Sequence, residues 1–203
     1  MDSNPFSTRF IRPGAIPYLF AEGESARTLV EKLRRQHWHG QITGAHGSGK
    51  STLLVALLPA LESVGRKVIL LSLHQGQPRL PPLDRESIGA TTQLVIDGFE
   101  QLSWWSRWRV HSLCRRRGAG LLVTAHAELG LPTIYRTQPS EALALRVVNA
   151  LLPSDDRAIA PSDVSRAYDT SGGNLRETLF ALFDVYQTRT RAQSDTTPSN
   201  HQP

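Results

Sequence analysis

The chain has 203 residues, a length typical of one domain with a small appendage, and it carries a net charge of +5 with a sequence pI of about 9.9. Hydrophobic residues make up 39% and charged residues 20%, as in ordinary globular proteins. No apolar run is long enough to span a bilayer, and the single cysteine, Cys114, excludes an intramolecular disulfide and argues against structural zinc. Because residues 1–6 lack a secretory pattern, we predict a cytoplasmic protein.

The first part of the chain combines prolines, glycines and aromatic residues. Residues 1–23 therefore predict an irregular N-terminal arm that is packed rather than disordered. Ser25 is a typical N-cap, and the spacing of apolar residues after it predicts a helix to about Gln36. The apolar residues at 41–43 predict the first strand.

A glycine-rich segment follows this strand. Residues 43–52 read TGAHGSGKST, and Gly44, Gly49, Lys50 and Ser51 have the spacing of the Walker A phosphate loop. Glycines let the backbone turn tightly so that several N–H groups aim at one phosphate, and Lys50 supplies a positive charge. We expect the nucleotide phosphates to contact the whole loop and the start of the next helix, namely Gly44, Ala45, His46, Gly47, Ser48, Gly49, Lys50, Ser51 and Thr52.

The context of the motif supports this interpretation. Leucines at 54, 57, 58 and 61 have helical spacing, so a strand, a loop and a helix follow one another. Pro59 lies inside this helix, where we expect it to introduce a kink, and Gly65 ends it. The helix N-terminus adds its positive end to the phosphate site.

The next elements alternate between strands and a helix. Residues 67–73 (KVILLSL) predict a strand buried on both faces, and the proline-rich stretch 74–90 predicts a long surface connection. Further strands are predicted at 93–96, 120–124 and 133–136, with a helix at 103–117 that stops at Gly118. This alternation predicts an α/β core over residues 24–139 with a parallel sheet between helices.

After Pro139 the pattern becomes entirely helical. We predict helices over 141–152, from Ser162 to Tyr168, and over 175–186, with Ser140 and Ser162 as N-caps. These helices would form a lid over residues 140–188. Residues 189–203 lack apolar residues that could build a core, so the sequence predicts a disordered tail.

An acidic residue ends the predicted strand at 93–96. Asp97 follows three apolar residues, which is the Walker B pattern, and the carboxyl ends of parallel strands meet at one edge of the sheet. Together with the Ser51 hydroxyl, the Asp97 carboxylate is expected to hold Mg²⁺. The alternative is an acidic residue that merely ends a strand.

Three residues are candidates for catalysis. Glu100 could position the attacking water, or it could be a solvated acid at the start of the next helix. Thr124 and His126 end a strand, where a polar side chain can sense the γ-phosphate or orient water. The sequence does not decide between these two, and the alternatives are an ordinary strand threonine and a loop histidine.

Arginines suggest two further sites. Arg176, at the start of the last helix, could reach the β- and γ-phosphates from the lid, or it could be a surface arginine paired with Glu177 or Asp169. The helix at 103–117 interleaves tryptophans and arginines, which could stack and bind nucleic-acid bases. We instead predict a partly buried helix with an arginine-coated outer face, with Arg115–Arg117 as an ordinary basic helix end.

With the phosphate loop, Asp97, the strand end at 124–126 and the turn at 173–176 (GNLR) in this order, the sequence resembles the AAA+ ATPases. Within them it is most similar to the ExeA-like, transposition-helper and origin-recognition branches, and residues 4–6 (NPF) are similar to the opening of ExeA-like proteins. The resemblance covers about residues 4–188. It implies a three-layer αβα sandwich with a parallel five-stranded sheet of order 5-1-4-3-2, a small helical lid, ATP as the nucleotide, and Lys50, Ser51, Asp97 and Arg176 in the roles given above.

Three features depart from this family pattern. Gly98 follows Asp97 where many members have glutamate, which argues against fast hydrolysis and is similar to the STAND signalling NTPases. No arginine lies between His126 and Ile134, where an arginine finger would stand, and Arg136 is the nearest. This argues against a hydrolytic ring. We see no effector domain after the lid, so a target would be met by the core or by a partner.

The sequence thus supports one leading hypothesis and several alternatives. The leading hypothesis is a Mg-ATP-binding AAA+-like protein whose hydrolysis is slow or stimulated by a protein partner and drives lid closure. The alternatives are a DNA-associated helper, suggested by the basic charge, and a non-hydrolysing scaffold gated by nucleotide. A kinase-type transferase would need an acceptor site, and the all-helical segment after Pro139 argues against it. Whether the chain forms oligomers stays open.

Overall fold

The computed structural model describes residues 4–84, 86–153 and 156–195. The chain divides into two compact units, which are described separately below. One unit is Phe20–Gln138, and it holds the sheet. The other combines the N-terminal segment through Leu19 with the chain from Pro139 onward, and it is helical. No helix among the described residues is long and apolar enough to cross a membrane.

The first unit is built on a five-stranded, all-parallel sheet. Its order is β2-β3-β4-β1-β5, so the α/β fold class and the predicted sheet order are confirmed. Strands β1 and β4 are neighbours and run parallel, so their carboxyl ends lie next to each other at the same edge of the sheet. The strands are β1 (His39–Thr43), β2 (Lys67–Ser72), β3 (Thr92–Asp97), β4 (Gly120–Ala125) and β5 (Thr133–Arg136).

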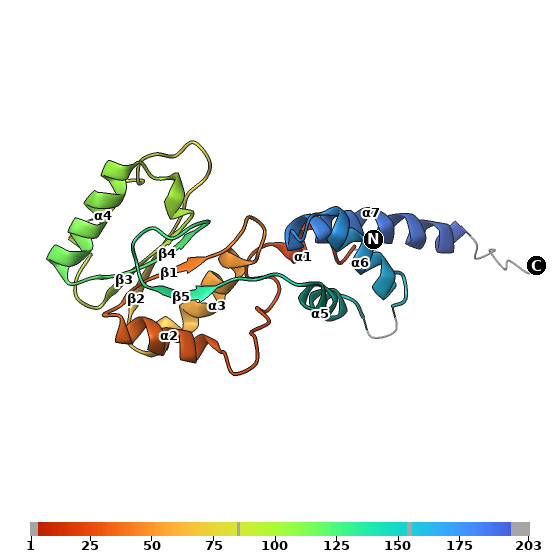
Figure 1. Ribbon diagram of the computed structural model, residues 1–203, viewed down its shortest axis with the longest axis horizontal. Helices are drawn as coiled ribbons and strands as arrows, with labels where there is room; N and C mark the ends of the chain where they lie inside the picture. Colours follow the sequence, from red (N-terminus) through yellow and green to blue (C-terminus); the bar gives the residue numbers. More distant parts are fainter. Residues whose placement is uncertain (1–3, 85, 154–155, 196–203) are drawn as a thin grey trace, which may run out of the picture. The chain divides into compact units, whose positions relative to one another are not determined.

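Helices cover both faces of this sheet, giving three layers (Figure 1). Helices α2 (Ala26–Arg35) and α3 (Lys50–Ser63) pack against each other on one face, and α4 (Trp104–Arg117) lies on the other. The predicted cap of α2 is present, because the Ser25 hydroxyl accepts a hydrogen bond from the Thr28 N–H group at 3.1 Å. Helix α3 continues through Pro59 to Ser63.

Strands β3 and β4 form the centre of the core. Leu94 and Ile96 of β3, with Leu121 and Val123 of β4, join one apolar cluster with residues of α4. The intervening residues point to the opposite face because side chains alternate along a strand. Every residue of β4 is buried, which explains why its sequence is an unbroken apolar run.

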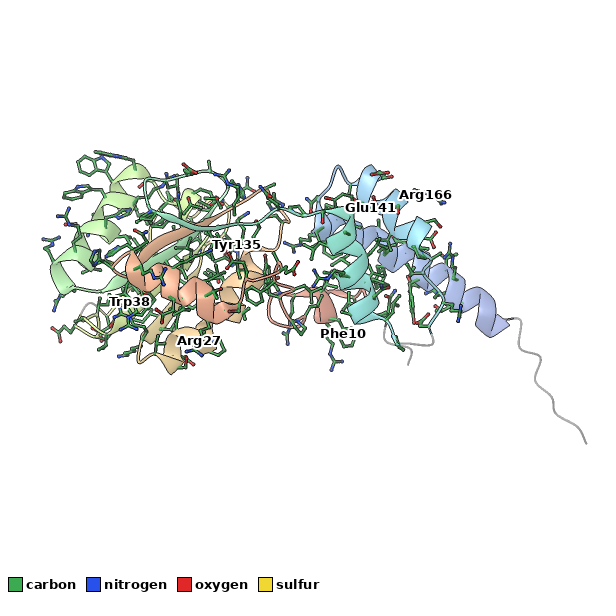
Figure 2. The ribbon with its side chains drawn as sticks, turned by 60° about the horizontal axis from the view of Figure 1, so that its bottom comes forward. Phe10, Arg27, Trp38, Tyr135, Glu141 and Arg166 are labelled. Atoms are coloured by element: carbon green, nitrogen blue, oxygen red, sulfur yellow. The ribbon has the colours of Figure 1, made fainter. Side chains whose placement is uncertain are left out.

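Strand β2 differs from the prediction. Its apolar run indicated a strand buried on both faces, but it lies at the sheet edge and pairs only with β3. Leu70 is 40% exposed as a result. Beside its start, the Arg66 guanidinium stacks 4.6 Å from the ring of Trp38, which Figure 2 labels, and donates to the carbonyl oxygens of Ala90 and Thr92. Burial of this arginine lowers the pKa of its guanidinium.

The helical unit is held together by one apolar core. Phe6, from the N-terminal segment, is fully buried in it with Ala144, Val148 and Leu182. The Asn4 side-chain amide also donates to the Phe183 carbonyl oxygen at 2.9 Å. The N-terminal segment is thus an integral part of this core. The helices are α1 (Thr8–Ile11), α5 (Glu141–Leu151), α6 (Pro161–Thr170) and α7 (Leu175–Asp195).

Two predictions about this unit are wrong. Ser162 does not cap α6, because the helix begins one residue earlier, at Pro161, and the Asp163 carboxylate accepts from the Ala160 N–H group at 2.9 Å. Residues 189–195, predicted to be disordered, continue α7 as helix, while 196–203 lie outside the described residues. Arg189 explains part of the extension, since it pairs with Asp163 at 2.5 Å and its hydrogen bond lowers the pKa of that carboxyl.

Candidate functional site

The glycine-rich segment forms a loop at the carboxyl end of β1. Its first N–H group, that of Gly44, donates to the Ala125 carbonyl oxygen of β4 at 3.3 Å. On the other side, the Thr137 N–H group donates to the Thr43 carbonyl oxygen at 2.8 Å. The loop is therefore anchored to both neighbours of β1 in the sheet.

The glycines of this loop are required by its shape. A Cβ atom at Gly44 would lie 2.8 Å from the Thr137 carbonyl oxygen and 2.9 Å from the Ser48 hydroxyl oxygen, which is too close for a side chain. Gly47 and Gly49 have φ angles of 70° and 90°, in the left-handed region that favours glycine. The backbone thus bends in the way that a phosphate-binding loop needs.

The buried hydroxyl groups of Ser48 and Thr137 hold the loop in place. The buried Ser48 hydroxyl lies 2.7 Å from the Ala45 carbonyl oxygen and 2.6 Å from the Thr137 hydroxyl, which is also buried. The Thr137 hydroxyl lies 3.2 Å from the Thr43 carbonyl oxygen. Sequence reasoning missed Thr137, and its place one residue after the β5 strand was the only available signal.

Lys50 lies inside the loop. Its ammonium group donates to the carbonyl oxygens of Gly44 at 2.8 Å and Ala45 at 2.7 Å, and the residue is buried. Desolvation lowers the pKa of its ammonium group, while the negative charges of Glu100 and Asp97 oppose that change. The ammonium group of Lys50 therefore interacts electrostatically with Asp97 and Glu100, the two acidic residues that the sequence indicated.

The first turn of α3 offers backbone N–H groups. Gly49 precedes the helix in a left-handed conformation, and no side chain among the described residues caps it. The first N–H group bonded back to this end is that of Leu53, which donates to the Gly49 carbonyl oxygen at 2.9 Å. The N–H groups ahead of it, with the positive end of the helix dipole, suit an anion.

Asp97 ends β3, the strand on the other side of β4. The Thr124 hydroxyl donates to the Asp97 carboxylate at 2.5 Å and accepts from the Gly98 N–H group at 2.8 Å. Because a hydroxyl has a single proton, the proton of Thr124 is committed to Asp97. This arrangement orients the Asp97 carboxylate, while the choice between Thr124 and His126 as a sensor of the γ-phosphate stays a prediction.

Gly98 explains the departure from the Walker B pattern. Its φ angle is 79°, and a Cβ atom there would lie 2.9 Å from the Leu73 carbonyl oxygen. A glutamate at this position would therefore be strained and crowded. The turn instead leads into a short 3-10 helix, η1 (Phe99–Gln101), whose middle residue is Glu100.

Glu100 lies beside the phosphate loop. One carboxylate oxygen is 3.3 Å from the Nε2 atom of His126, and the other is buried with no hydrogen-bond partner among the described residues. The His126 ring packs edge to face against the ring of His46, a loop residue, with 5.7 Å between centroids. Ser103 caps α4, and the Glu100 side chain is 21% exposed, so Glu100 is not a solvated acid at that helix start.

Arg176 belongs to the helical unit. Its guanidinium lies 5.6 Å from the centre of the Phe180 ring, and its N–H group donates to the Asn174 side chain at 3.1 Å. Within the described residues it forms no ion pair with Glu177 or Asp169, which was the alternative interpretation. Its approach to a nucleotide stays a prediction.

A metal site formed by Ser51 and Asp97 stays a prediction. No group of three or more histidine, cysteine, aspartate or glutamate side chains converges among the residues that the structure describes. Mg²⁺ is commonly held by one or two protein oxygens, with phosphates and waters completing its coordination. The Ser51 hydroxyl and the Asp97 carboxylate supply oxygens of this kind.

Comparisons with known proteins add little. No protein-family model matches the chain, and no curated protein matches it. Among solved structures, the chain is similar to one described as the structure of C. elegans PCH-2, with a TM-score of 0.37 and 14% sequence identity. The match covers 82% of this chain and 66% of that chain, which is just under two thirds of its length. A similarity this weak does not show what the chain binds.

Proposed function

We propose that this protein is a Mg-ATP-binding P-loop NTPase of the AAA+ type, with hydrolysis that is slow or stimulated by a partner. The observation that carries the proposal is the loop itself: a segment with a crowded glycine at Gly44 and left-handed glycines at Gly47 and Gly49 bends around a buried lysine at the carboxyl edge of a parallel sheet. A hydrolysis-defective protein that only binds ATP is the alternative.

Several groups of the loop would bind the phosphates together. Backbone N–H groups at the start of α3 face the position of an anion, and the Lys50 ammonium group would exchange its two carbonyl contacts for phosphate oxygens. The exchange is favourable because a phosphate oxygen carries negative charge and attracts the ammonium group more strongly than a neutral carbonyl oxygen does. Arg176 would add a second positive charge from the helical unit when that unit acts as a lid.

Asp97 and Ser51 would hold the metal. The bound Mg²⁺ supplies charge neutralisation for the phosphates. The Thr124 hydroxyl donates a hydrogen bond to one Asp97 oxygen and would keep that carboxylate oriented toward the metal. Thr124 is therefore a positioning residue for the metal ligand, rather than a sensor of the γ-phosphate.

Glu100 would position the attacking water. Its buried oxygen has no partner among the described residues, and a buried acceptor without a partner costs about 1–3 kcal/mol. A water molecule bound there would give this oxygen a hydrogen-bond partner, and the oxygen would in turn orient the water. His126 contacts the other carboxylate oxygen of Glu100 and packs against His46 of the loop. A change in the conformation of the loop would therefore move His126 and, with it, the Glu100 carboxylate.

Titration calorimetry with Mg-ATP tests nucleotide binding. The unmodified protein is expected to bind, Lys50→Ala is expected to lose binding, and Lys67→Ala serves as the control because Lys67 is an exposed lysine at the start of β2. Absence of binding by the unmodified, folded protein contradicts the proposal.

Steady-state turnover at saturating Mg-ATP tests the role of Glu100. The Glu100→Gln variant is expected to bind ATP normally and to turn it over at least tenfold more slowly. If the unmodified protein binds ATP but shows no turnover, the non-hydrolysing alternative is correct and Glu100 has no catalytic role under those conditions.

A further inference from the structure

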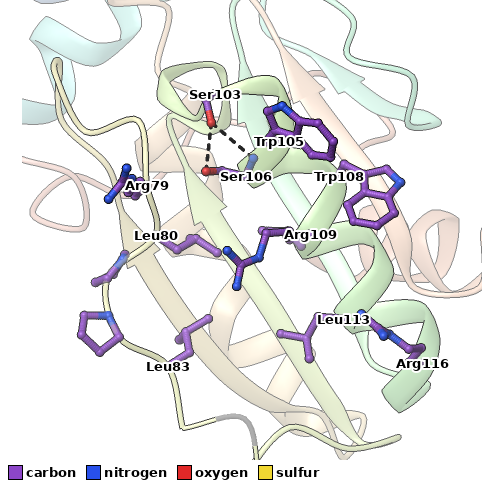
Figure 3. Close-up of a pocket in the computed structure, with 13 residues that line it drawn as sticks. Arg79, Leu80, Leu83, Ser103, Trp105, Ser106, Trp108, Arg109, Leu113 and Arg116 are labelled. Carbon is purple, nitrogen blue, oxygen red and sulfur yellow. Dashed lines mark hydrogen bonds between the residues drawn. The ribbon is translucent and has the colours of Figure 1, made fainter.

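A groove lies outside the phosphate-loop region, between α4 and the segment that follows β2 (Figure 3). Its volume is about 930 Å³. Residues 79–83 form one wall, and α4 forms the other with Trp105, Trp108, Arg109 and Leu113. In Figure 3, Arg109 points from the helix toward the segment that carries Leu80. We call this feature the α4 groove.

Exposed tryptophans border the α4 groove. Trp105 and Trp108 line it with exposures of 64% and 55%, and Trp104, which does not line it, is 67% exposed. Helix α4 is partly buried through Val110 and Cys114, as predicted, but its tryptophans lie on the exposed part of the helix. The rings contact each other edge to face, with centroid distances of 4.7 Å between Trp104 and Trp105 and 6.1 Å between Trp105 and Trp108. Clustered large apolar side chains in water mark an interaction site.

The floor of the groove is aliphatic and anchored. Leu80, Leu83 and Leu113 are partly buried and pack against the apolar cluster beneath α4. The Ser106 hydroxyl and the Ser103 N–H group both donate to the Pro78 carbonyl oxygen, at 2.8 Å and 3.1 Å. These bonds tie the proline-rich segment to the helix, so the groove is formed without a partner.

The groove is also positively charged. Arg79, Arg109 and Arg116 line it, and among the described residues no acidic side chain does. None of the three arginines forms an ion pair within the part of the chain that the structure describes. Asp84 and Glu86 lie farther along the same segment, outside the lining. The charge thus complements an anionic partner.

We propose that the α4 groove binds an acidic segment of a partner protein that carries aliphatic or aromatic anchor residues. Its carboxylates would pair with the arginines, whose planar guanidinium groups suit bidentate bonds to carboxylates. Its apolar side chains would cover the leucine floor between the tryptophans. Tryptophan and arginine are the residue types that dominate the binding energy of protein interfaces.

The chemistry of the floor favours a peptide over a nucleic acid. Single-stranded nucleic acids need open aromatic faces on which bases stack. Here the floor is made of leucine side chains, and the tryptophan rings contact one another edge to face at the border of the groove. Aliphatic anchors fit such a floor better than bases do. The proposal does not rest on nucleotide binding, so it can fail or succeed independently of the proposed function.

Selection from a random peptide library displayed on phage, with the full-length protein as bait, tests the proposal. Phage that also bind a Trp105→Ala/Trp108→Ala double variant are removed, and the consensus peptide is synthesised with a fluorescent label. We expect a consensus with several acidic residues and one or more apolar anchors. Anisotropy should show affinity at least tenfold weaker for the double variant and for Arg109→Glu, while Trp104→Ala, outside the lining, loses less than threefold.

Three results would overturn the proposal. The first is a selection without an acidic consensus, or peptides whose binding survives both groove variants. The second is labelled oligothymidine that binds the unmodified protein and is lost in the same variants, which would assign the groove to nucleic acid. The third is a change in mass by light scattering in the double variant, which would assign the groove to a second copy of this chain. Thermal unfolding verifies that every variant is folded.

Discussion

The carboxyl edge of the sheet and the α4 groove belong to the same unit but satisfy their polar groups differently. At the sheet edge, Lys50, Asp97 and Thr124 each have a hydrogen-bond partner within the chain. In the α4 groove, Arg109 forms no ion pair among the described residues, and its neighbour Trp108 is more than half exposed. The polar groups of the first region are held by contacts within the chain, whereas the arginines of the second are left to solvent or to a partner.

Loss of the loop lysine should have the largest effect at the sheet edge. In Lys50→Ala the site loses its buried positive charge, so affinity for Mg-ATP is expected to fall at least a hundredfold, which corresponds to about 2.7 kcal/mol. Calorimetric titration measures this. An affinity for Mg-ATP within threefold of that of the unmodified protein would show that the lysine does not contact phosphate. The sheet edge would then no longer differ from the α4 groove as a preformed site.

The next largest effect is expected from Gly98→Ala. The new Cβ atom would meet the Leu73 carbonyl oxygen at 2.9 Å in a left-handed backbone, so the free energy of unfolding should fall by about 2–3 kcal/mol. Gly76→Ala is the matched control, because its φ angle is 86° and nothing lies within 4 Å of the added atom. Urea unfolding should show a loss of about 1 kcal/mol for the control. Equal losses would mean that crowding at Gly98 is unimportant.

Removal of the Thr124 hydroxyl should have an intermediate effect. Thr124→Val leaves the Asp97 carboxylate without its 2.5 Å partner, so the proposed metal ligand becomes free to rotate. We expect Mg²⁺-dependent turnover, or Mg-ATP affinity if there is no turnover, to fall about tenfold, or about 1.4 kcal/mol. Thr124→Ser keeps a hydroxyl and should restore most of the loss. A serine variant as poor as the valine variant would indicate a packing defect instead.

The smallest effect on stability is expected in the α4 groove. Trp105→Ala and Trp108→Ala remove side chains that are mostly exposed, so each should change the free energy of unfolding by less than about 0.5 kcal/mol. Urea unfolding of the single variants measures this. A loss above about 1.5 kcal/mol would show that the tryptophans support the fold, and it would remove the reason to expect a partner there.

Much of the first unit was predictable because its signals are local. Gly44 and Lys50 belong to a short motif of fixed spacing. Ser25 begins α2 through its side-chain hydrogen bond, and Gly118 ends α4 in a left-handed conformation. The apolar run of β4 likewise indicated a strand buried on both faces. A similar apolar run led to the wrong prediction that β2 is buried on both faces, because an apolar pattern does not show whether a strand has a neighbour on each side.

The sequence by itself determined the glycine-rich loop after β1, the succession of strands and helices, and several of the residues that begin or end them, because each depends on neighbours a few positions away. Only the tertiary structure decided that Thr124 holds Asp97, that Glu100 meets His126, and that Thr137 supports Ser48. It also decided that the tryptophans of α4 face water. These outcomes join residues that are distant in the chain, and the packing of a sheet edge brings them together in ways that no local pattern encodes.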